Sequence, residues 1–309
     1  MPTPTLVVVN PRSRNGSTAR RWEAAAKRVR AALGELSVEH TRGPRDAERI
    51  ALEGAVRGAE RIVVAGGDGT TSEVVTGLLA ADLGEKVELG LLPLGTGGDL
   101  ARTLGIPTSL DRAIETLARG KTRRADAGRL RYRDRSGRDA EAFFLNVASL
   151  GISGLVDELV NRTSKTLGGR LSFLLGTLQA VVRYRNVAVS IDVDGQLLYS
   201  GRIVLAAVAN GRFFGGGMQI APEARIDDGA LDLVVVKDLP RRELFRQLPS
   251  IYTGRHLSHP QVLCARGSRI SIEAEPGSAR LDVDGEALGS APATLEILPG
   301  AIRLFGTGS

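Results

Sequence analysis

Cysteine, histidine and long apolar runs are all scarce in this chain of 309 residues. The single cysteine, Cys264, excludes an internal disulfide, and with only three histidines the chain lacks the ligands for a structural zinc cage. We therefore expect a reducing, cytoplasmic setting. The longest uncharged stretches, residues 142–156 and 171–182, fall short of the roughly 18–20 residues that cross a bilayer. Residues 1–10 also lack the basic start and apolar body of a signal peptide.

Lysine and aromatic residues are scarce as well, although the chain is basic. Its formal net charge is +6, from 41 basic and 35 acidic residues, and only 5 of the basic residues are lysines, which leaves 41 − 5 = 36 arginines. This excess indicates either an arginine-rich genome or attraction to nucleic acid, nucleotide phosphates or an anionic membrane. Aromatics at 4% argue against a stacking platform for single strands. Since no nucleic-acid-binding module is recognisable, we expect no nucleic acid partner.

Strand and helix patterns alternate through the first part of the chain. Apolar runs predict strands over residues 5–10, 37–41, 61–65 and 88–93, and apolar residues at helical spacing predict helices over 17–33, 46–58, 72–81 and 110–119. Such alternation is typical of a parallel sheet covered by helices. The sequence therefore predicts an α/β N-terminal domain.

Strand-like runs dominate after residue 129. They follow a polar, hairpin-like segment over residues 130–139 and cover residues 186–193, 196–207, 230–236, 268–275, 280–283 and 301–305. Asp-Gly and Pro-Gly turns separate several of them. Two helical segments, residues 167–183 and 241–252, interrupt the pattern. We predict a second, β-rich domain built as an antiparallel sandwich.

Two glycine-rich loops follow neighbouring predicted strands. Residues 66–70 (GGDGT) and 93–99 (PLGTGGD) each lead into a helix, where glycines allow close approach to a phosphate and the helix offers free amides. With residues 10–13 (NPRS), both loops would face one crevice at the carboxyl ends of the strands. Asp68 would repel a bare phosphate, so it indicates Mg²⁺ as mediator. The alternative is a tight turn in which Asp68 caps a helix.

These motifs and their order resemble the soluble lipid kinases of the diacylglycerol kinase and sphingosine kinase family, especially the bacterial YegS-like enzymes. The resemblance extends over residues 144–154, 210–222, 227–234 and the DVDGE run at 282–286. It implies an ATP-binding α/β domain of the NAD kinase and diacylglycerol kinase type over residues 1–128, completed by residues 293–309. It also implies a β-rich lipid-binding domain over residues 129–292, with catalysis in the cleft between the two domains.

The resemblance also assigns roles to single residues. Glu286 would be the general base for a lipid hydroxyl, whereas Gln196 ends a near copy of the same run and cannot act as a base. Asp68 and Asp99 would complete the catalytic set. The residues implied on the ATP side are Asn10, Arg12, Ser13, Arg14, Thr41, Gly66, Gly67, Asp68, Gly69, Thr70, Glu73 and Thr96. The catalytic Mg²⁺ would be held by Asp68, Asp99 and Asp126, and a structural Mg²⁺ by Asp228 and the carbonyls of Arg225 and Ala230.

The implied reaction is ATP- and Mg²⁺-dependent transfer of the γ-phosphoryl group to diacylglycerol or a related lipid. The enzyme would act as a peripheral protein at an anionic membrane surface. Its oligomeric state is left open, and a homodimer is one alternative. Arg241, Arg242, Arg246 and Arg255 form either a membrane-facing surface or a solvated helix face.

Two other functions stay open. The first is an NAD kinase-like enzyme, since such enzymes share the GGDGT run. The second is a regulator that binds nucleotide or lipid without turnover, because Gly98 and Arg14 stand where the family usually has asparagine and glycine.

Overall fold

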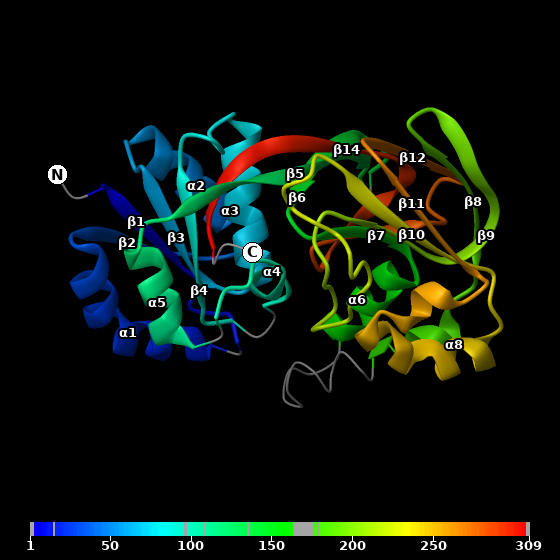
Figure 1. Ribbon diagram of the computed structural model, residues 1–309, viewed down its shortest axis with the longest axis horizontal. Helices are drawn as coiled ribbons and strands as arrows, with labels where there is room; N and C mark the ends of the chain where they lie inside the picture. Colours follow the sequence, from blue (N-terminus) through cyan, green and yellow to red (C-terminus); the bar gives the residue numbers. More distant parts are fainter. Residues whose placement is uncertain are drawn as a thin grey trace. The chain divides into compact units, whose positions relative to one another are not determined.

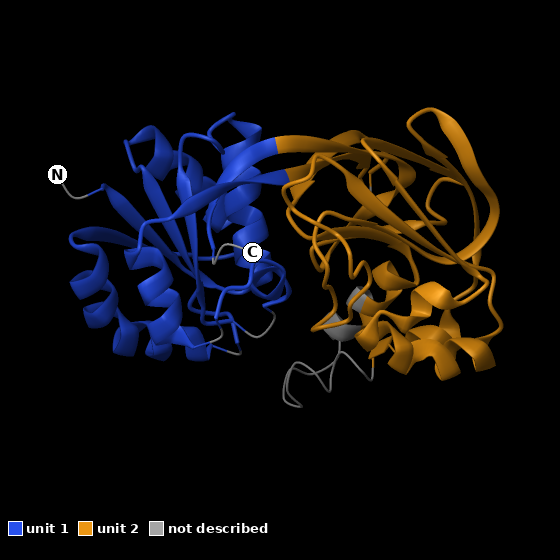
Figure 2. Cartoon of the chain, in the orientation of Figure 1, with its two compact units in different colours: residues 1–126, 300–309 blue, residues 127–299 orange. Residues whose placement is uncertain are grey.

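The protein is described from a computed structural model of residues 3–306, apart from residues 15, 96–97, 108, 135, 163–175 and 178. The chain divides into two compact units, residues 1–126 with 300–309 and residues 127–299 (Figure 2). It passes between them within two strands, β5 (Thr122–Arg133) and β14 (Glu286–Phe305). The C-terminal end of β14 thus belongs to the same unit as the N-terminal strands.

The first unit is a parallel sheet with helices (Figure 1). Its strands are β1 (Thr5–Val9), β2 (Leu36–His40), β3 (Arg61–Gly66) and β4 (Glu88–Pro93), in the order β14-β4-β3-β1-β2. The helices are α1 (Ser17–Leu33), α2 (Asp46–Val56), α3 (Asp68–Ala80), α4 (Asp99–Thr103) and α5 (Leu110–Ala118). Strands β1, β3 and β4 are almost wholly buried, as expected for parallel strands covered on both faces. The predicted α/β class is confirmed.

The second unit is an antiparallel sheet that closes on itself. Its strands, besides parts of β5 and β14, are β6 (Asp139–Phe144), β7 (Val147–Gly151), β8 (Val187–Val193), β9 (Gln196–Ala209), β10 (Leu231–Lys237), β11 (Val262–Gly267), β12 (Arg269–Ala274) and β13 (Arg280–Val283). Pairing runs β9-β7-β13-β14-β12-β8 and returns to β9. The ring closes because β9 is long enough to pair with β8 near its start and β7 near its end. A β-rich antiparallel domain is confirmed, while the two-sheet sandwich stays a prediction.

Alternating side chains of β9 serve two separate cores. Ala206 and Val208 belong to the cluster built from β7, β8, β10, β12, β13 and β14. Their neighbours Leu205, Ala207 and Ala209 belong to a second cluster. Helix α8 (Arg241–Gln247) and the 3₁₀ turns η2 (Leu248–Thr253) and η3 (Arg255–Ser258) pack against this second cluster. The strand period of two residues therefore places apolar groups on both faces of the sheet.

Several predicted boundaries differ from the structure. Helix α3 begins at Asp68, four residues before the predicted start, so the last three residues of the GGDGT run lie in its first turn. The strand predicted over 301–305 is only the end of β14, and β5 and β7 were not predicted because charged or small residues conceal their alternation. The predicted helix over 241–252 is α8 followed by η2. The predicted helix over 167–183 lies largely outside the described residues; within it, residues 176–177 and 179–183 are described and helical.

Among the residues that the structure describes, no helix has the length and apolar character needed to cross a bilayer. Helix α6 (Ile152–Arg162) packs against β13, close in sequence to the DVDGE run.

Candidate active site

Three loops meet at the carboxyl ends of adjacent parallel strands. Strand β3 lies between β1 and β4, so the loops that follow these strands are neighbours, as the sequence predicts. Asn10, directly after β1, donates from Nδ2 to Thr70 Oγ1 at 2.9 Å and accepts the Arg12 backbone N–H at 3.0 Å. Ser13 donates from Oγ to the Asn10 carbonyl at 3.0 Å. Asn10 therefore fastens the NPRS loop to the first turn of α3.

The two glycine-rich loops touch through their backbones. Gly95 donates its N–H to the Gly66 carbonyl at 2.8 Å. A Cβ placed on Gly95 would lie 2.4 Å from the Gly67 Cα, far inside van der Waals contact. Only glycine can occupy position 95 while the loops stay this close. The N-cap of α3 is Gly67, which has no side chain, so the amides of the first turn can serve an anion.

Asp68 and Asp99 lie close together at the start of α4. Asp68 Oδ2 accepts the N–H groups of Gly98 at 2.8 Å and Asp99 at 3.0 Å. Asp68 is thus a cap, but of α4 and not of its own helix α3. The Asp99 carboxylate is buried and pairs with Arg102 on the same helix.

Glu73 is engaged with a different helix. Its Oε2 accepts the Ala47 N–H at 3.1 Å, in the first turn of α2. Burial raises the pKa of the Glu73 carboxyl, and hydrogen bonds from the backbone N–H groups of Arg45 and Ala47 oppose that effect. Its observed role is to join α3 to α2.

The other predicted ATP-side residues lie on these loops or, for Thr41, directly after β2. Thr41 is buried at the end of β2, where its N–H bonds to the Val9 carbonyl at 2.9 Å. Arg12 and Arg14 are exposed, and Arg14 has a positive φ of 50°. Gly69 lies in the first turn of α3, and Thr96 lies outside the described residues.

The predicted acidic set only partly comes together. The backbone N–H of Asp99 bonds to Asp68 Oδ2, while the Asp99 carboxylate pairs with Arg102. Asp126 is buried on β5, where Oδ1 accepts the Gly300 N–H at 2.7 Å. Within the described ranges, no group of three or more His, Cys, Asp or Glu side chains is arranged to hold a metal. A Mg²⁺ held by Asp68 and Asp99 would compete with the Arg102 guanidinium and would need waters as its remaining ligands.

At the site predicted for a structural Mg²⁺, an arginine side chain already bonds to the aspartate. Asp228 Oδ1 accepts the Ala230 N–H at 3.2 Å, and Oδ2 accepts Arg266 Nη2 at 2.5 Å. Arg225 pairs with Asp227 at 3.3 Å. A metal at Asp228 would therefore compete with the Arg266 guanidinium.

Glu286 follows a tight turn in the second unit. The turn residues Asp284 and Gly285 have φ values of 48° and 89°, which matches a two-residue hairpin between β13 and β14. Glu286 is partly buried, whereas Gln196, after the equivalent turn between β8 and β9, is exposed. A carboxylate held on a rigid hairpin can accept a proton from a bound hydroxyl.

Three segments around this turn belong to motifs for which the sequence indicates no individual role. The carboxylate of Asp284 accepts backbone N–H groups from residues 145–147, and Asn146 and Asn210 connect the same segment to residues 210–213. The signal in the sequence was the recurrence of asparagine and aspartate at these motifs, since both residues bind backbone groups well.

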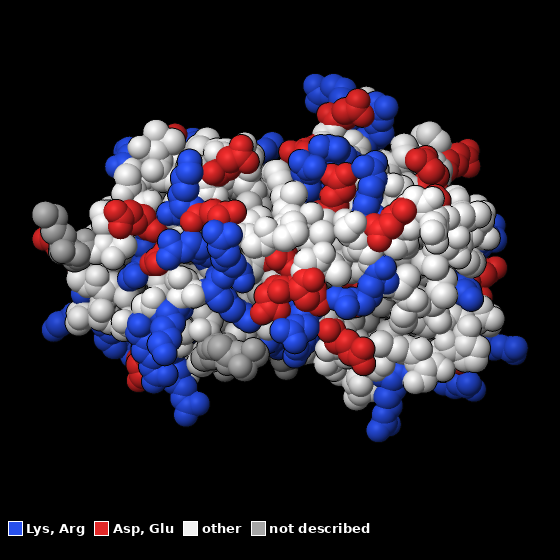
Figure 3. Space-filling view, turned by 45° about the horizontal axis from the view of Figure 1, so that its top comes forward, with Lys and Arg blue, Asp and Glu red and all other residues white. Residues whose placement is uncertain are grey.

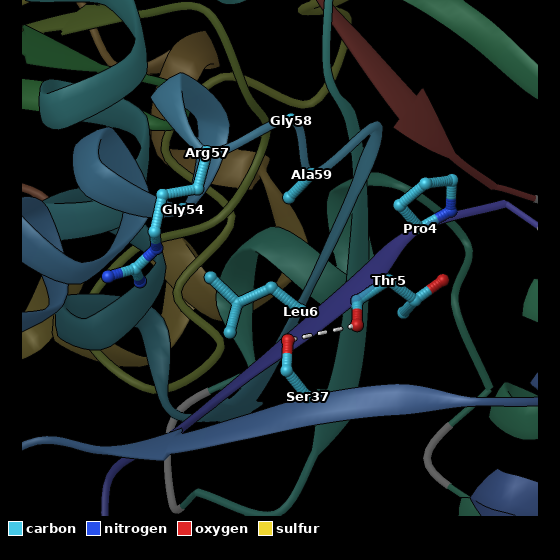
Figure 4. A pocket seen from close by; sticks show the side chains of 8 residues that line it. All are labelled: Pro4, Thr5, Leu6, Ser37, Gly54, Arg57, Gly58 and Ala59. Atoms are coloured by element: carbon cyan, nitrogen blue, oxygen red, sulfur yellow. Dashed lines mark hydrogen bonds between the residues drawn. The ribbon is translucent and has the colours of Figure 1, made fainter.

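A small pocket of about 150 Å³ lies at the opposite end of β1 from these loops (Figure 4). It is lined by Pro4, Thr5, Leu6, Ser37, Gly54, Arg57, Gly58 and Ala59. Ser37 donates across it to the Thr5 carbonyl at 3.4 Å. Because the glycine-rich loops follow the carboxyl ends of the strands, this pocket is separate from them.

Comparisons with known proteins agree with the motifs. The diacylglycerol kinase catalytic domain matches residues 4–130, and the YegS C-terminal NAD kinase beta sandwich-like domain matches residues 146–306. The chain is 30% identical to a diacylglycerol kinase of Bacillus subtilis over 287 residues, or 93% of this chain and 90% of that protein. It is also 30% identical to a diacylglycerol kinase of Mycobacterium tuberculosis over 300 residues, or 96% and 93% of the two chains.

The fold agrees as well. The crystal structure of a proposed diacylglycerol kinase from Bacillus anthracis superposes with a TM-score of 0.78 at 27% identity, covering 99% of this chain and 97% of that one. The chain therefore belongs to the diacylglycerol kinase and YegS-like family of lipid kinases. The family resemblance predicted from the motifs is confirmed.

Proposed function

We propose that the protein transfers the γ-phosphoryl group of ATP to the hydroxyl of diacylglycerol or a related lipid. The main support for this proposal is a comparison of two similar hairpins, one between β8 and β9 and one between β13 and β14, which differ in the residue after the turn. Both copies have an Asp-Gly turn, but only the second is followed by a carboxylate, Glu286, and only the second lies in the family's DGE motif. The nucleotide loops belong to one unit and Glu286 to the other.

The nucleotide side uses backbone groups. The close contact of Gly95 with Gly66 and Gly67 leaves no side chain between the loops, and the start of α3 supplies N–H donors and the positive end of a helix dipole. The Asn10 to Thr70 bond holds the first loop against that helix. Positioning and charge neutralisation are the main demands of phosphoryl transfer.

Asp68 and Asp99 would hold Mg²⁺ beside the phosphates. A bound Mg²⁺ neutralises charge that develops on the phosphoryl oxygens. Asp68 also fixes the start of α4 through two backbone N–H groups, so its replacement would disturb both metal and loop.

Glu286 would act as general base. Its carboxylate takes the proton of the lipid hydroxyl while the hydroxyl oxygen bonds to the γ-phosphorus and the bond to the ADP oxygen breaks. The products are a phosphorylated lipid and ADP.

Transfer of label from γ-labelled ATP into extracted lipid tests this reaction. Glu286→Gln should lower turnover by about 10²-fold or more, since one general base contributes about that much. Gln196→Ala is the matched control, because it alters the equivalent position of the first hairpin. Full turnover in Glu286→Gln would refute the base assignment, and label in a water-soluble product would refute the lipid acceptor.

The second unit also offers a surface suited to an anionic membrane. We define the α8 surface as Arg241, Arg242, Phe245, Arg246, Tyr252 and Arg255, all exposed. Phe245 and Tyr252 are 39% and 49% exposed, while Leu244, Ile251 and Leu257 of the same segment pack against the core. Glu243 is the neighbouring carboxylate and pairs with one of the four arginines, Arg246, at 3.0 Å, so the surface keeps a net positive charge. Aromatic side chains among arginines are typical of peripheral membrane contact.

The remaining positive charge is more dispersed. On the face shown in Figure 3, basic and acidic side chains are interspersed. Arg49 pairs with Asp46 at 2.7 Å and with Glu53 at 2.8 Å, and Arg129 pairs with Glu296 at 2.6 Å. Paired arginines attract a distant polyanion less than unpartnered ones do.

Sedimentation with phosphatidylglycerol and phosphatidylcholine vesicles tests the α8 surface. The double variant Arg242→Glu/Arg246→Glu should lower binding to anionic vesicles by about 30-fold, at about 1 kcal/mol for each basic residue lost. Phe245→Ser should weaken binding to both. Arg30→Glu on α1 and Leu197→Ser on β9 are controls, because both side chains are exposed outside this surface. Equal binding by the α8 variants and the controls would exclude this surface.

A further inference from the structure

The Asp284 carboxylate binds three successive backbone N–H groups far away in sequence. Its oxygens accept from Leu145 at 3.1 Å, Asn146 at 3.2 Å and Val147 at 2.9 Å, and its own N–H donates to the Val147 carbonyl at 3.0 Å. These three residues are almost fully buried. Buried N–H groups require partners, so one carboxylate satisfies a whole segment between β6 and β7. We name this arrangement the Asp284 clasp.

The first hairpin contains the same device at a different place. Asp194, with a φ of 50°, accepts the Ser268 N–H at 3.0 Å and the Arg269 N–H at 2.9 Å, and its own N–H donates to the Arg269 carbonyl at 2.9 Å. In both copies the aspartate of the Asp-Gly turn therefore anchors the hairpin to a distant backbone segment. The arrangement also exists in the first hairpin, where Gln196 cannot act as a base. The aspartate therefore holds the hairpin in place and does not itself take part in proton transfer.

A second set of bonds extends the Asp284 clasp. The Asn146 carbonyl accepts N–H groups from Asn210 at 2.9 Å and Gly211 at 2.8 Å. The side chain of Asn210 donates to the Leu145 carbonyl at 2.8 Å, and that of Asn146 donates to the Phe213 carbonyl. Residues 145–147, 210–213 and 284–286 thus form one hydrogen-bonded unit, and Glu286 lies at its end.

We propose that Asp284 is a positioning residue for Glu286, which it orients through the clasp to residues 145–147. This inference rests on the proposed function of Glu286. A general base must lie within hydrogen-bond reach of the proton it removes. A displacement of about 1 Å can lower the rate by about 10²-fold. Asp284 lies two residues before Glu286 in a two-residue turn, so a change in its anchoring is transmitted directly to the base.

A double-mutant cycle on lipid phosphorylation tests the proposal, with Asp284→Asn, Glu286→Gln and the double variant. Asparagine keeps the shape but turns an N–H donor toward backbone N–H groups. We expect Asp284→Asn to lower kcat by about 10²-fold, with KM for ATP changed by less than about twofold and the pH profile of kcat shifted. The double variant should be no slower than Glu286→Gln, because Asp284 acts through Glu286.

Asp194→Asn is the matched control for loss of the same structural device. It should lower the melting temperature about as much as Asp284→Asn but leave kcat near the wild-type value. Equal kcat in Asp284→Asn and Asp194→Asn overturns the positioning role alone. So does a double variant that is much slower than Glu286→Gln. Wild-type turnover in Glu286→Gln overturns the proposed function as well. If Asp284→Asn does not fold, Asp284→Ser, which retains one acceptor oxygen, replaces it in the same cycle.

Discussion

Gly95→Ala should separate the two glycine-rich loops. A Cβ at this position would lie 2.4 Å from the Gly67 Cα and 2.8 Å from the Gly66 carbonyl oxygen, and both are backbone atoms that cannot rotate away. Restoring a contact of about 3.4 Å requires a shift of about 1 Å. That shift would lengthen the 2.8 Å bond from Gly95 N–H to the Gly66 carbonyl beyond hydrogen-bond range.

The expected cost combines two effects. Overpacking costs about 1–3 kcal/mol, and the lost hydrogen bond adds about 1 kcal/mol. We therefore expect the free energy of unfolding of the first unit to fall by about 2–4 kcal/mol. The affinity for a nucleotide should fall too, because the loops no longer present their amides at the same separation.

Urea unfolding followed by tryptophan fluorescence measures this change. The only tryptophan, Trp22, is buried in α1 and so reports on the first unit. Gly43→Ala is the matched control, since a Cβ at Gly43 meets no atom within 4 Å and its φ is not positive. A denaturation midpoint of Gly95→Ala equal to that of Gly43→Ala would show that the loops do not approach as described.

Three further predictions concern single side chains. Gly98→Asn should be tolerated, because Gly98 has a φ of 92° with open space around its Cα and asparagine adopts such angles readily, so its melting temperature should match wild type. Glu73→Gln should gain stability relative to wild type as pH rises above about 4.5, the ordinary pKa of a glutamate, because a raised folded pKa makes the wild-type protein lose stability as its carboxyl ionises; a pH-independent difference in urea midpoint would contradict this. Arg266→Met should lower the melting temperature by about 2–4 °C, as expected for loss of about 1 kcal/mol from a half-exposed ion pair with Asp228. Added Mg²⁺ should restore that loss if the Asp228 loop accepts a cation, and equal melting with and without Mg²⁺ would count against a metal there.

Local patterns were sufficient for the order of elements in the first unit. Strand β4 and the start of α2 at Asp46 lie where periodicity places them, because buried strands and amphipathic helices leave a signal in consecutive residues. The motif order alone also predicted the family, which the comparisons confirm.

Side-chain partners were less accessible to sequence reasoning. The expected roles of Asp68 at Mg²⁺ and of Glu73 on the nucleotide side stay predictions. No sequence pattern indicated that Asp68 would bond to the start of α4, 30 residues farther along, or that Glu73 would bond to α2. Such partners depend on which loops the packed sheet brings together. The local sequence around each residue does not indicate these long-range contacts.

The sequence by itself determined the class of this protein, its glycine-rich loops and the contrast between Glu286 and Gln196. Those features are local, since a turn or a missing Cβ depends on the residue itself. Only the tertiary structure decided how the ring of strands closes through β9 and what holds the DGE turn in place. Both depend on contacts between distant segments, such as Asp284 with residues 145–147, whose geometry exists only once the sheet has formed.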